Sequence, residues 1–406
     1  MAWRNIWRNP RRTLLTVSAI AFACVLLIFM LSFQFGSYET MINAAVKIQT
    51  GHFQVQDKRY REKRDIRHTV ENPEAVDAVL DRTKGVAAYT HRAEAFSIVS
   101  SKDRTYGALV IGIDPVREAG VSTLKSLVRD GEYLSESDRA RALVGRLLAR
   151  NLKVGIGDEL TLLGQGRDGS VAAAVVTVKG VYSSGQDDFD RAGIHITLHD
   201  FQEIYSMSGE VHQVVALVDA LSNVSEIARR VQVEVKKLET GDDLVVLDWS
   251  EIMPGLKQAI SMDLVSGLIF WLLLIIVVAF SILNTFLMAI FERKREFGVM
   301  MAIGTAPSRL TKIVLMESMF MTLVGIAAGI ILGIVVTLYF EGHGIDIGGA
   351  GELLKQYGIS GRMYPKLSVL STSIGPAMVF CITFLAALYP ALKVRRLKPV
   401  EAMTSG

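Results

Sequence analysis

Four apolar runs, each long enough to cross a membrane, constrain the fold of this 406-residue chain more than any other feature. They occupy residues 13–36, 264–291, 318–340 and 367–392. Each run exceeds the ~20 residues that an α-helix needs to span ~30 Å of hydrocarbon. The mean hydropathy of +0.33 is typical of a membrane protein, but charged residues make up 21% of the chain, too many for a wholly buried bundle. We therefore expect four transmembrane helices and a sizeable water-exposed domain.

The short segments that flank these runs differ in their content of basic residues. The loop 341–366 holds three lysines and arginines. The other short segments together hold thirteen: Arg4, Arg8, Arg11, Arg12, Arg293, Lys294, Arg295, Arg309, Lys312, Lys393, Arg395, Arg396 and Lys398. Because short loops rich in lysine and arginine stay in the cytoplasm, we expect both termini there. The chain should be a multi-pass protein of the cell inner membrane, with residues 37–263 on the periplasmic side.

These assignments predict the domain boundaries. Residues 1–12 should form a cytoplasmic amphipathic helix, with Trp3, Ile6 and Trp7 on one face and arginines on another. The following segments are transmembrane helix 1 at 13–36, the periplasmic domain with stalk helices at 37–263, transmembrane helix 2 at 264–291, a cytoplasmic coupling segment at 292–317, transmembrane helix 3 at 318–340, a periplasmic loop at 341–366, transmembrane helix 4 at 367–392 and a cytoplasmic tail at 393–406.

The segment between the first and second runs is too long for a loop and should be a mixed α/β extracytoplasmic domain. Strand-like stretches occur at 52–56, 95–100, 109–113, 159–163, 174–181 and 214–218. Helical stretches occur at 73–83, 140–151, 199–205 and 222–238. A further helix, 251–262, should continue directly into the second run. The predicted fold is an α-helical membrane protein with this domain inserted between transmembrane helices 1 and 2.

Energy coupling would need a nucleotide site, and the sequence contains no G-x-x-x-x-G-K-[S/T] loop to cradle phosphates. We therefore expect no enzyme activity and no cofactor in this chain, with ATP and Mg bound by a separate ATPase. A net charge of +3, without a basic tract interleaved with aromatic residues, argues against nucleic acid as a partner.

The connection between the second and third runs is the most informative segment for a partner. Its first half, 291–296, is charged, whereas its second half contains Phe297, Met300, Met301 and Ile303 but is too short to cross a membrane. Loops seldom expose such an apolar stretch. We interpret the segment as a short helix at the membrane face that inserts into a groove of the partner.

The third run carries two further features. Gly325, Gly329 and Gly333 recur every fourth residue, a ridge that lets another helix approach closely, either within one chain or across a dimer. Glu317 precedes the run. A proton relay would need an acid near the membrane midplane, so we favour a structural ion pair between Glu317 and a nearby arginine or lysine.

Two features of the predicted domain have metal-ligand residue types. His195 and His199 are four residues apart, but His195 lies in an apparent strand and no third ligand is evident, which disfavours zinc. Asp187, Asp188 and Asp190 lack the further oxygen ligands that calcium needs, so a solvated turn is the preferred interpretation. No nucleophile is accompanied by a base and an orienting group. We predict neither a metal site nor a catalytic site.

Several segments together resemble the permease superfamily that includes MacB, FtsX and the lipoprotein-releasing LolC and LolE subunits. Residues 3–13, Trp-Arg-Asn-Ile-Trp-Arg-Asn-Pro-Arg-Arg-Thr, resemble its entry helix. Residues 293–304, Arg-Lys-Arg-Glu-Phe-Gly-Val-Met-Met-Ala-Ile-Gly, resemble its coupling segment, and 389–402 resemble its C-terminal signature. Residues 143–158 resemble the helix and turn of its outer domain.

The resemblance implies a dimer of identical or homologous permeases bound to two ATPase subunits. The stalk role would lie at 251–262 and 37–46. The coupling role would lie on Arg293, Lys294, Arg295, Glu296, Phe297, Gly298, Met300, Met301, Ile303 and Gly304.

Residues 175–183 and 194–198 look closest to the lipoprotein-releasing branch. The carrier-recruiting hook of that branch contains proline and aromatic residues, whereas the corresponding stretch here, 163–170, contains neither. This departure leaves a LolE-like partner, a homodimeric variant or another substrate open.

Three functions are compatible with these observations. The first is extraction of lipoprotein, or a related amphiphile, from the outer leaflet, with a periplasmic carrier or adaptor as a further partner. The second is mechanotransmission of the MacB kind in tripartite efflux, and the third is FtsX-like regulation of a cell-wall hydrolase. For the first, apolar residues near the outer ends of helices 1 and 2 would line a substrate cleft: Phe33, Phe35, Leu264, Val265, Leu268 and Ile269.

Overall fold

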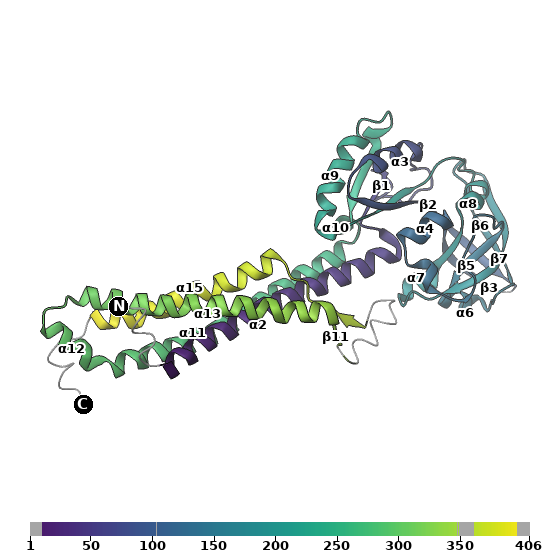
Figure 1. Ribbon diagram of the computed structural model, residues 1–406. Helices are drawn as coiled ribbons and strands as arrows, with labels where there is room; N and C mark the ends of the chain where they lie inside the picture. The colour runs from purple at the N-terminus through teal and green to yellow at the C-terminus, as the bar shows by residue number, and fades with distance from the viewer. Residues whose placement is uncertain (1–9, 103, 347, 349–360, 396–406) are drawn as a thin grey trace. The chain divides into compact units, whose positions relative to one another are not determined.

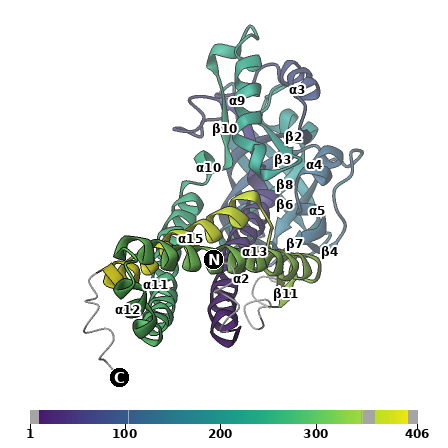
Figure 2. The same cartoon turned by 60° about the vertical axis from the view of Figure 1, so that its left-hand side comes forward.

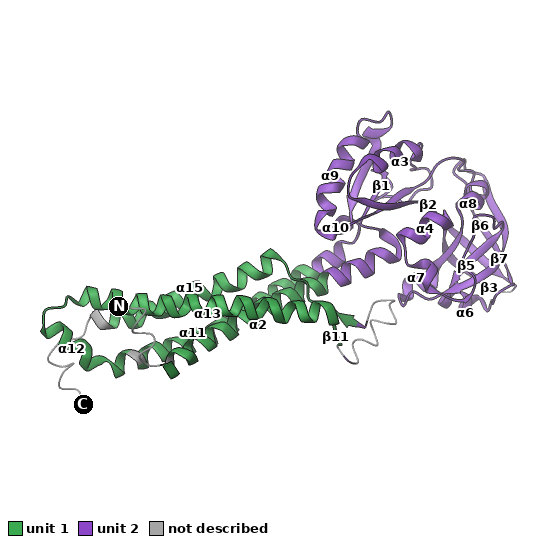
Figure 3. Cartoon of the chain, viewed as in Figure 1, with its two compact units in different colours: residues 1–38, 259–347, 362–406 green, residues 39–258, 348–361 purple. Residues whose placement is uncertain are grey.

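The computed structural model describes residues 10–102, 104–346, 348 and 361–395, which form two compact units (Figures 1 and 3). One unit comprises residues 1–38, 259–347 and 362–406, and the other comprises 39–258 and 348–361. The predicted entry helix at 1–12 and the tail at 393–406 lie largely outside the described residues.

The first unit contains most of the four helices that are long and apolar enough to cross a membrane. They are α2 (Pro10–Ala45), α11 (Pro254–Glu292), α13 (Pro307–His343) and α15 (Val369–Arg395). A short helix, α12 (Lys294–Ala302), connects α11 to α13. Pro307 stands at the start of α13, where its missing amide proton has no intrahelical partner to lose. The predicted set of four apolar helices is therefore confirmed.

The glycine ridge of α13 packs against α2 of the same chain. A Cβ atom at Gly329 would lie 2.5 Å from the Cβ of Cys24 and 2.8 Å from the carbonyl oxygen of Ala21. Added Cβ atoms at Gly325 and Gly333 would likewise meet α2, at Ile20 and Ile28. Of the two alternatives left by the sequence, the structure gives packing within one chain.

Gly329→Leu should therefore destabilise the helical unit, because the added side chain would push α13 away from α2. Overpacking of this kind costs ~1–3 kcal/mol. The matched control is Gly342→Leu in the same helix, where an added Cβ would have nothing within 4 Å. Thermal unfolding of the purified full-length protein should show a lowered midpoint for Gly329→Leu alone. Equal midpoints for the two variants would contradict this packing.

The second unit is built on a sheet that has ten strands among the described residues, in the order β10-β1-β9-β2-β3-β8-β5-β7-β4, with β6 paired to β2 and β7. The strands are β1 (Phe53–Asp57), β2 (Val86–Ser101), β3 (Arg104–Ile113), β4 (Val128–Gly131), β5 (Arg141–Gly145), β6 (Glu159–Gln165), β7 (Val171–Tyr182), β8 (Gly193–Thr197), β9 (Gln213–Val218) and β10 (Leu244–Asp248). The β3–β8 and β5–β7 pairs are parallel and the others are antiparallel. The mixed α/β class predicted for this domain is confirmed.

The helices of this unit are α3 (Pro73–Arg82), α4 (Pro115–Val121), α5 (Leu124–Leu127), α6 (Arg146–Leu152), α7 (Asp187–Ala192), α8 (Leu198–Ile204), α9 (Val224–Val235) and α10 (Trp249–Ile252). One core lies between α3, α9 and the strands β1, β9 and β10, with Phe53, Leu80 and Val231 fully buried or nearly so. A second core lies under β2, β5, β6, β7 and β8, with α6 and α8 packed on it.

Two local predictions for this unit are wrong, and the start of a third element is shifted. The helix expected at 140–151 is strand β5 followed by α6, because Ala142, Leu143 and Val144 pair with neighbouring strands and are buried on both faces. The helix expected to run from 251 into the second apolar run is continuous, as α11, but it begins at Pro254, after α10 ends. The acidic run is a helix, α7, in which the buried Asp190 accepts hydrogen bonds from Ser183 and Ser184.

Three buried histidines make this unit acid-sensitive. Burial lowers the pKa of His52 and His212 to about 4 and that of His195 to about 3. In the unfolded chain a histidine takes up its proton near pH ~6.5. Between pH ~6.5 and ~4 the unfolded state therefore binds more protons, and the free energy of unfolding falls as the pH falls.

The expected loss is ~3 kcal/mol for each histidine across that window. Hydrogen exchange of β9 amides in the full-length protein should report faster opening at pH 5 than at pH 7.5, after correction for intrinsic exchange. His212→Gln should reduce this dependence, whereas His199→Gln, at an exposed position, should leave it unchanged. A pH-independent opening free energy would rule out neutral buried histidines.

Candidate functional site

The segment expected to couple to an ATPase is α12 with its two flanks, and Figure 2 shows this short helix between α11 and α13. The helix ends at Ala302, and Gly304, two residues later, has a φ of +99°, a conformation that glycine adopts without strain. The amide of Gly304 donates to the Met301 carbonyl at 3.0 Å, and that of Thr305 donates to the Met300 carbonyl at 2.9 Å. This hydrogen-bonding pattern satisfies the terminal carbonyls and stops the helix.

One side of α12 is fixed on the same chain. Phe297 is 1% exposed and Met301 is 8% exposed. They pack in a cluster whose other buried members are Ile290, Leu310, Val314 and Ala391. The segment is thus a helix held against α11, α13 and α15, not a free loop.

An ion pair holds the start of α12 to α13. The Arg293 guanidinium lies 2.8 Å from Glu317 and 3.3 Å from Glu296, and it also lies over the Phe297 ring, 5.2 Å from its centroid. The side chain of Arg293 is 16% exposed and that of Glu317 is 8% exposed. The ion pair that the sequence favoured for Glu317 is therefore present.

The other side of α12 is open. Ile303 is 81% exposed and Val299 is 43% exposed, and the side chain of Arg295 is also exposed. The expectation that the whole apolar half faces a partner needs correction, because Phe297 and Met301 are buried in the same chain and Met300 is half-buried against their cluster. The surface available to a partner is centred on Ile303.

At the opposite end of the helical unit, polar groups connect α2 to α11. The Tyr38 hydroxyl donates to the Asp263 carboxylate at 2.5 Å. The Gln34 amide donates to Tyr38 at 2.6 Å and to Asp263 at 3.2 Å. Gly267 lies against Gln34, where an added Cβ would come within 2.8 Å of its amide nitrogen.

The six residues predicted to line a substrate cleft lie beside this connection. Phe33, Phe35 and Leu264 are half-buried. The other three are exposed on α11 and form one strip with later residues at helical spacing: Val265, Leu268, Ile269, Leu272 and Ile276. A lipid tail or a second permease could cover this strip, which the rest of the described chain leaves open.

An apolar surface that the sequence analysis missed lies on the sheet of the second unit. Ile98 pairs with Leu163, and Leu163 pairs with Ala173, whose neighbours two positions away are Val171 and Val175. Because residues opposite each other, and residues two apart, share a face of a sheet, these side chains lie together with Phe96. We call this surface the apolar face: Phe96, Ile98, Leu163, Val171 and Val175.

The members of the apolar face are between 44% and 76% exposed. The opposite side of the same strands forms the core, with Val99 and Val176 fully buried. The sequence signal for this surface is a strand that has apolar residues at both even and odd positions although one of its faces is exposed to water. Exposed apolar patches of this kind often mark binding surfaces.

The described residues contain no group of three histidine, cysteine, aspartate or glutamate side chains that could hold a metal ion. His195 lies in β8, as expected, and is buried beside Tyr182 and Phe189. Its Nδ1 has no hydrogen-bond partner among the described residues.

Four long apolar helices with an α/β domain inserted after the first define a membrane permease subunit. Residues 13–233 match the MacB-like periplasmic core domain, and residues 268–399 match the FtsX-like permease C-terminal family. The chain belongs to this family of MacB- and FtsX-like ABC transporter permeases, whose members work in membranes with an ATPase partner.

Several curated proteins are similar to the chain. The LolC transmembrane protein of a lipoprotein-releasing system from Xylella fastidiosa is 24% identical over 74% of both chains. LolC from Neisseria meningitidis is 21% identical over 96% of this chain and 93% of its own. The pyoverdine export ATP-binding/permease protein PvdT from Pseudomonas entomophila is 22% identical over the whole chain but only 59% of its own length. The periplasmic region of MacB from Actinobacillus actinomycetemcomitans aligns with a TM-score of 0.39 at 15% identity, over 53% of this chain and 98% of its own.

Proposed function

We propose that this permease extracts lipoprotein, or a related lipid-like amphiphile, from the outer leaflet of the inner membrane. A separate ATPase, present in two copies and binding ATP and Mg, supplies the energy, and a second permease, identical or homologous, completes the transporter. The observation that carries the proposal is the apolar face. In water no lipid covers such a surface, so it is available to an apolar cargo or partner.

The names of the LolC relatives support lipoprotein as the cargo class. PvdT is named as an ATP-binding/permease protein, and this chain covers only part of it. That partial coverage supports an ATP-binding function on a part that this chain does not match. The exposed surface around Ile303 is where we place the contact with the ATPase.

Two continuous helices would transmit the conformational change of the ATPase to the second unit. Both α2 and α11 contribute residues to the helical unit and to the sheet-containing unit. A displacement that begins at α12 can reach the second unit along α11 without crossing a loop. This arrangement also suits MacB-type mechanotransmission, the second candidate function, which the PvdT relatives favour.

Affinity isolation from native membranes tests the cargo. Wild-type protein should retain acylated proteins, detected by mass spectrometry of their lipid-modified N-terminal peptides, whereas Phe96→Lys and Val175→Lys should lose them. The matched control is Val116→Lys, at an apolar position of α4 that is 65% exposed and lies outside the apolar face. Recovery of a tripartite efflux adaptor would favour mechanotransmission, and recovery of a cell-wall hydrolase would favour regulation.

The proposed orientation predicts a labelling pattern in intact cells. In a background that lacks Cys24 and Cys381, a cysteine at Asp188 should react with a membrane-impermeant maleimide, because 37–263 is periplasmic. A cysteine at Ser308 should react only after the inner membrane is opened. Both positions are exposed, so access depends on the side of the membrane. The reverse pattern would overturn the orientation derived from the basic residues.

A further inference from the structure

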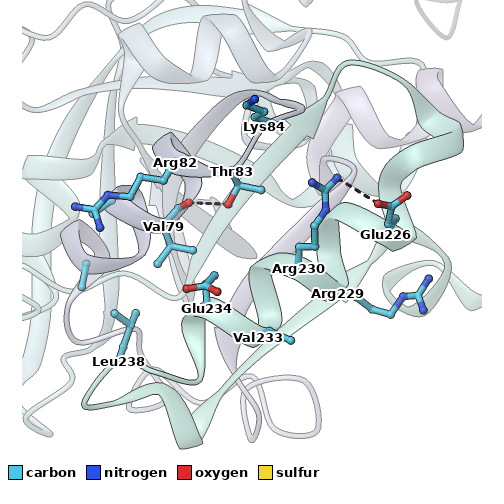
Figure 4. Close-up of a pocket in the computed structure, with 12 residues that line it drawn as sticks. Val79, Arg82, Thr83, Lys84, Glu226, Arg229, Arg230, Val233, Glu234 and Leu238 are labelled. Carbon is cyan, nitrogen blue, oxygen red and sulfur yellow. Dashed lines mark hydrogen bonds and ion pairs between the residues drawn. The ribbon is translucent and has the colours of Figure 1, made fainter.

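A groove of about 930 Å³ runs between α3 and α9 of the second unit (Figure 4). Its apolar lining comes from both helices and from the residue that follows α9 by three positions: Ala75, Ala78, Val79, Val233 and Leu238. Val233, in the last turn of α9, is 59% exposed. The groove is separate from the apolar face, which lies on strands β2, β6 and β7.

Both helices present a second face to the groove, although Val79 and Leu238 of its lining also pack against the core. In α9 the core positions are Val224, Ile227, Ala228, Val231 and Val235. The groove positions of the same helix recur at i, i+3, i+4, i+7 and i+8, namely Glu226, Arg229, Arg230, Val233 and Glu234. In α3 the groove positions have the same periodicity. The two walls are therefore continuous stripes and not scattered surface residues.

The charges around the groove are unbalanced. Four basic side chains, Arg82, Lys84, Arg229 and Arg230, line it with two acidic ones. Glu226 lies 3.6 Å from Arg230, and Glu234 lies 2.6 Å from Lys237, which is not a lining residue. Among the described residues, Arg82, Lys84 and Arg229 have no carboxylate within ion-pair distance. Figure 4 places Arg82 and Arg229 far apart, at opposite sides of the apolar lining.

We propose that this groove binds an acidic amphipathic helix of a partner protein on the same side of the membrane as the second unit. An apolar floor between two helices accepts side chains at i, i+3 and i+4 of a third helix. The basic side chains lie on the two sides of the groove, its rims. Acidic residues on both flanks of the bound helix can reach the cations of both rims at once. Because Arg82 and Arg229 lie at opposite sides of the apolar lining, an extended helix suits the groove better than a single anionic lipid headgroup. The partner is additional to the ATPase and to the cargo.

The test uses full-length permease in nanodiscs of zwitterionic lipid. The probe is a fluorescent synthetic helix about five turns long, with leucines on one stripe and glutamates on both flanks. A second probe replaces the glutamates by lysines. The dissociation constant of the acidic probe should be at least ~10-fold lower than that of the basic probe, and it should rise with salt, because rim charges act through screened electrostatics.

Two variants and a matched control locate the binding. Arg82→Glu/Arg229→Glu and Val233→Asp should each weaken the acidic probe about tenfold or more. Lys125→Glu/Arg150→Glu makes the same charge change at exposed positions outside the groove and should bind like wild type. Equal affinity for the two probes, or unchanged binding by the rim variant, overturns the proposal. Displacement of the probe by a short-chain phosphatidylglycerol would assign the groove to lipid instead.

Discussion

Ile303→Asp is expected to separate the permease from its ATPase while leaving the permease folded. Ile303 is 81% exposed at the end of α12, so its replacement alters no core packing. At an interface, however, the aspartate would become a buried carboxylate without a partner, which costs several kcal/mol. A loss of ~3 kcal/mol weakens binding more than a hundredfold. Co-purification of the tagged permease with its ATPase should fail, and ATP-dependent activity should disappear with it.

Control variants distinguish loss of the ATPase contact from unfolding of the permease. Ile303→Leu and Lys294→Ala should retain the ATPase, because rim charges and conservative apolar changes contribute little to interfaces. Met301→Asp should instead unfold the helical unit, since Met301 is 8% exposed inside the chain. Protease resistance of the second unit should be unchanged in Ile303→Asp. An intact and fully active complex in that variant would move the ATPase contact away from α12.

Breaking the Arg293–Glu317 pair should cause the second large effect. Removing either partner takes away the nearest opposite charge of a largely buried side chain, and breaking a buried pair typically costs ~3–5 kcal/mol. Glu317→Met and Arg293→Met should each lower the thermal midpoint of the purified permease and reduce coupling to the ATPase. The double variant Arg293→Met/Glu317→Met should recover much of the stability, because it removes both charges of the pair.

A double-mutant cycle measures this interaction. Arg295→Met serves as the control, since Arg295 is a neighbouring but exposed cation. The losses of stability in the two single variants should together exceed the loss in the double variant. Additive effects of the two substitutions would show that Arg293 and Glu317 contribute independently and that their contact does not hold α12 to α13.

The sequence predicted those features that depend on long, regular patterns. Four apolar runs gave four helices, and the apolar and charged halves of 291–304 indicated a short helix at a surface. The burial of Phe297 and Met301 was not predictable, because the sequence pattern of a nine-residue helix is too short to indicate which of its faces is buried. The buried face is determined by packing against residues outside the helix, namely Leu310, Val314 and Ala391.

Further features of both units show the same dependence on distant contacts. The glycine spacing in α13 predicted close helix packing but could not identify α2 as the partner. Residues 141–145 read as part of a helix because a strand buried on both faces has no alternation. The apolar face required the register of β2, β6 and β7, which no local pattern specifies. The α3–α9 groove likewise required two helices that are far apart in the chain.

ATP-driven release of an acylated cargo from reconstituted membranes tests the proposed transport most directly. Permease and its co-purified ATPase would be placed in liposomes with a fluorescent lipoprotein, and release to soluble albumin would be followed with and without ATP. Release should require ATP, the ATPase and the acyl chains, and it should be lost with Ile303→Asp and with Phe96→Lys. Full ATPase activity without any release of acylated cargo, or equal release of the same protein without its acyl chains, would contradict the proposed function.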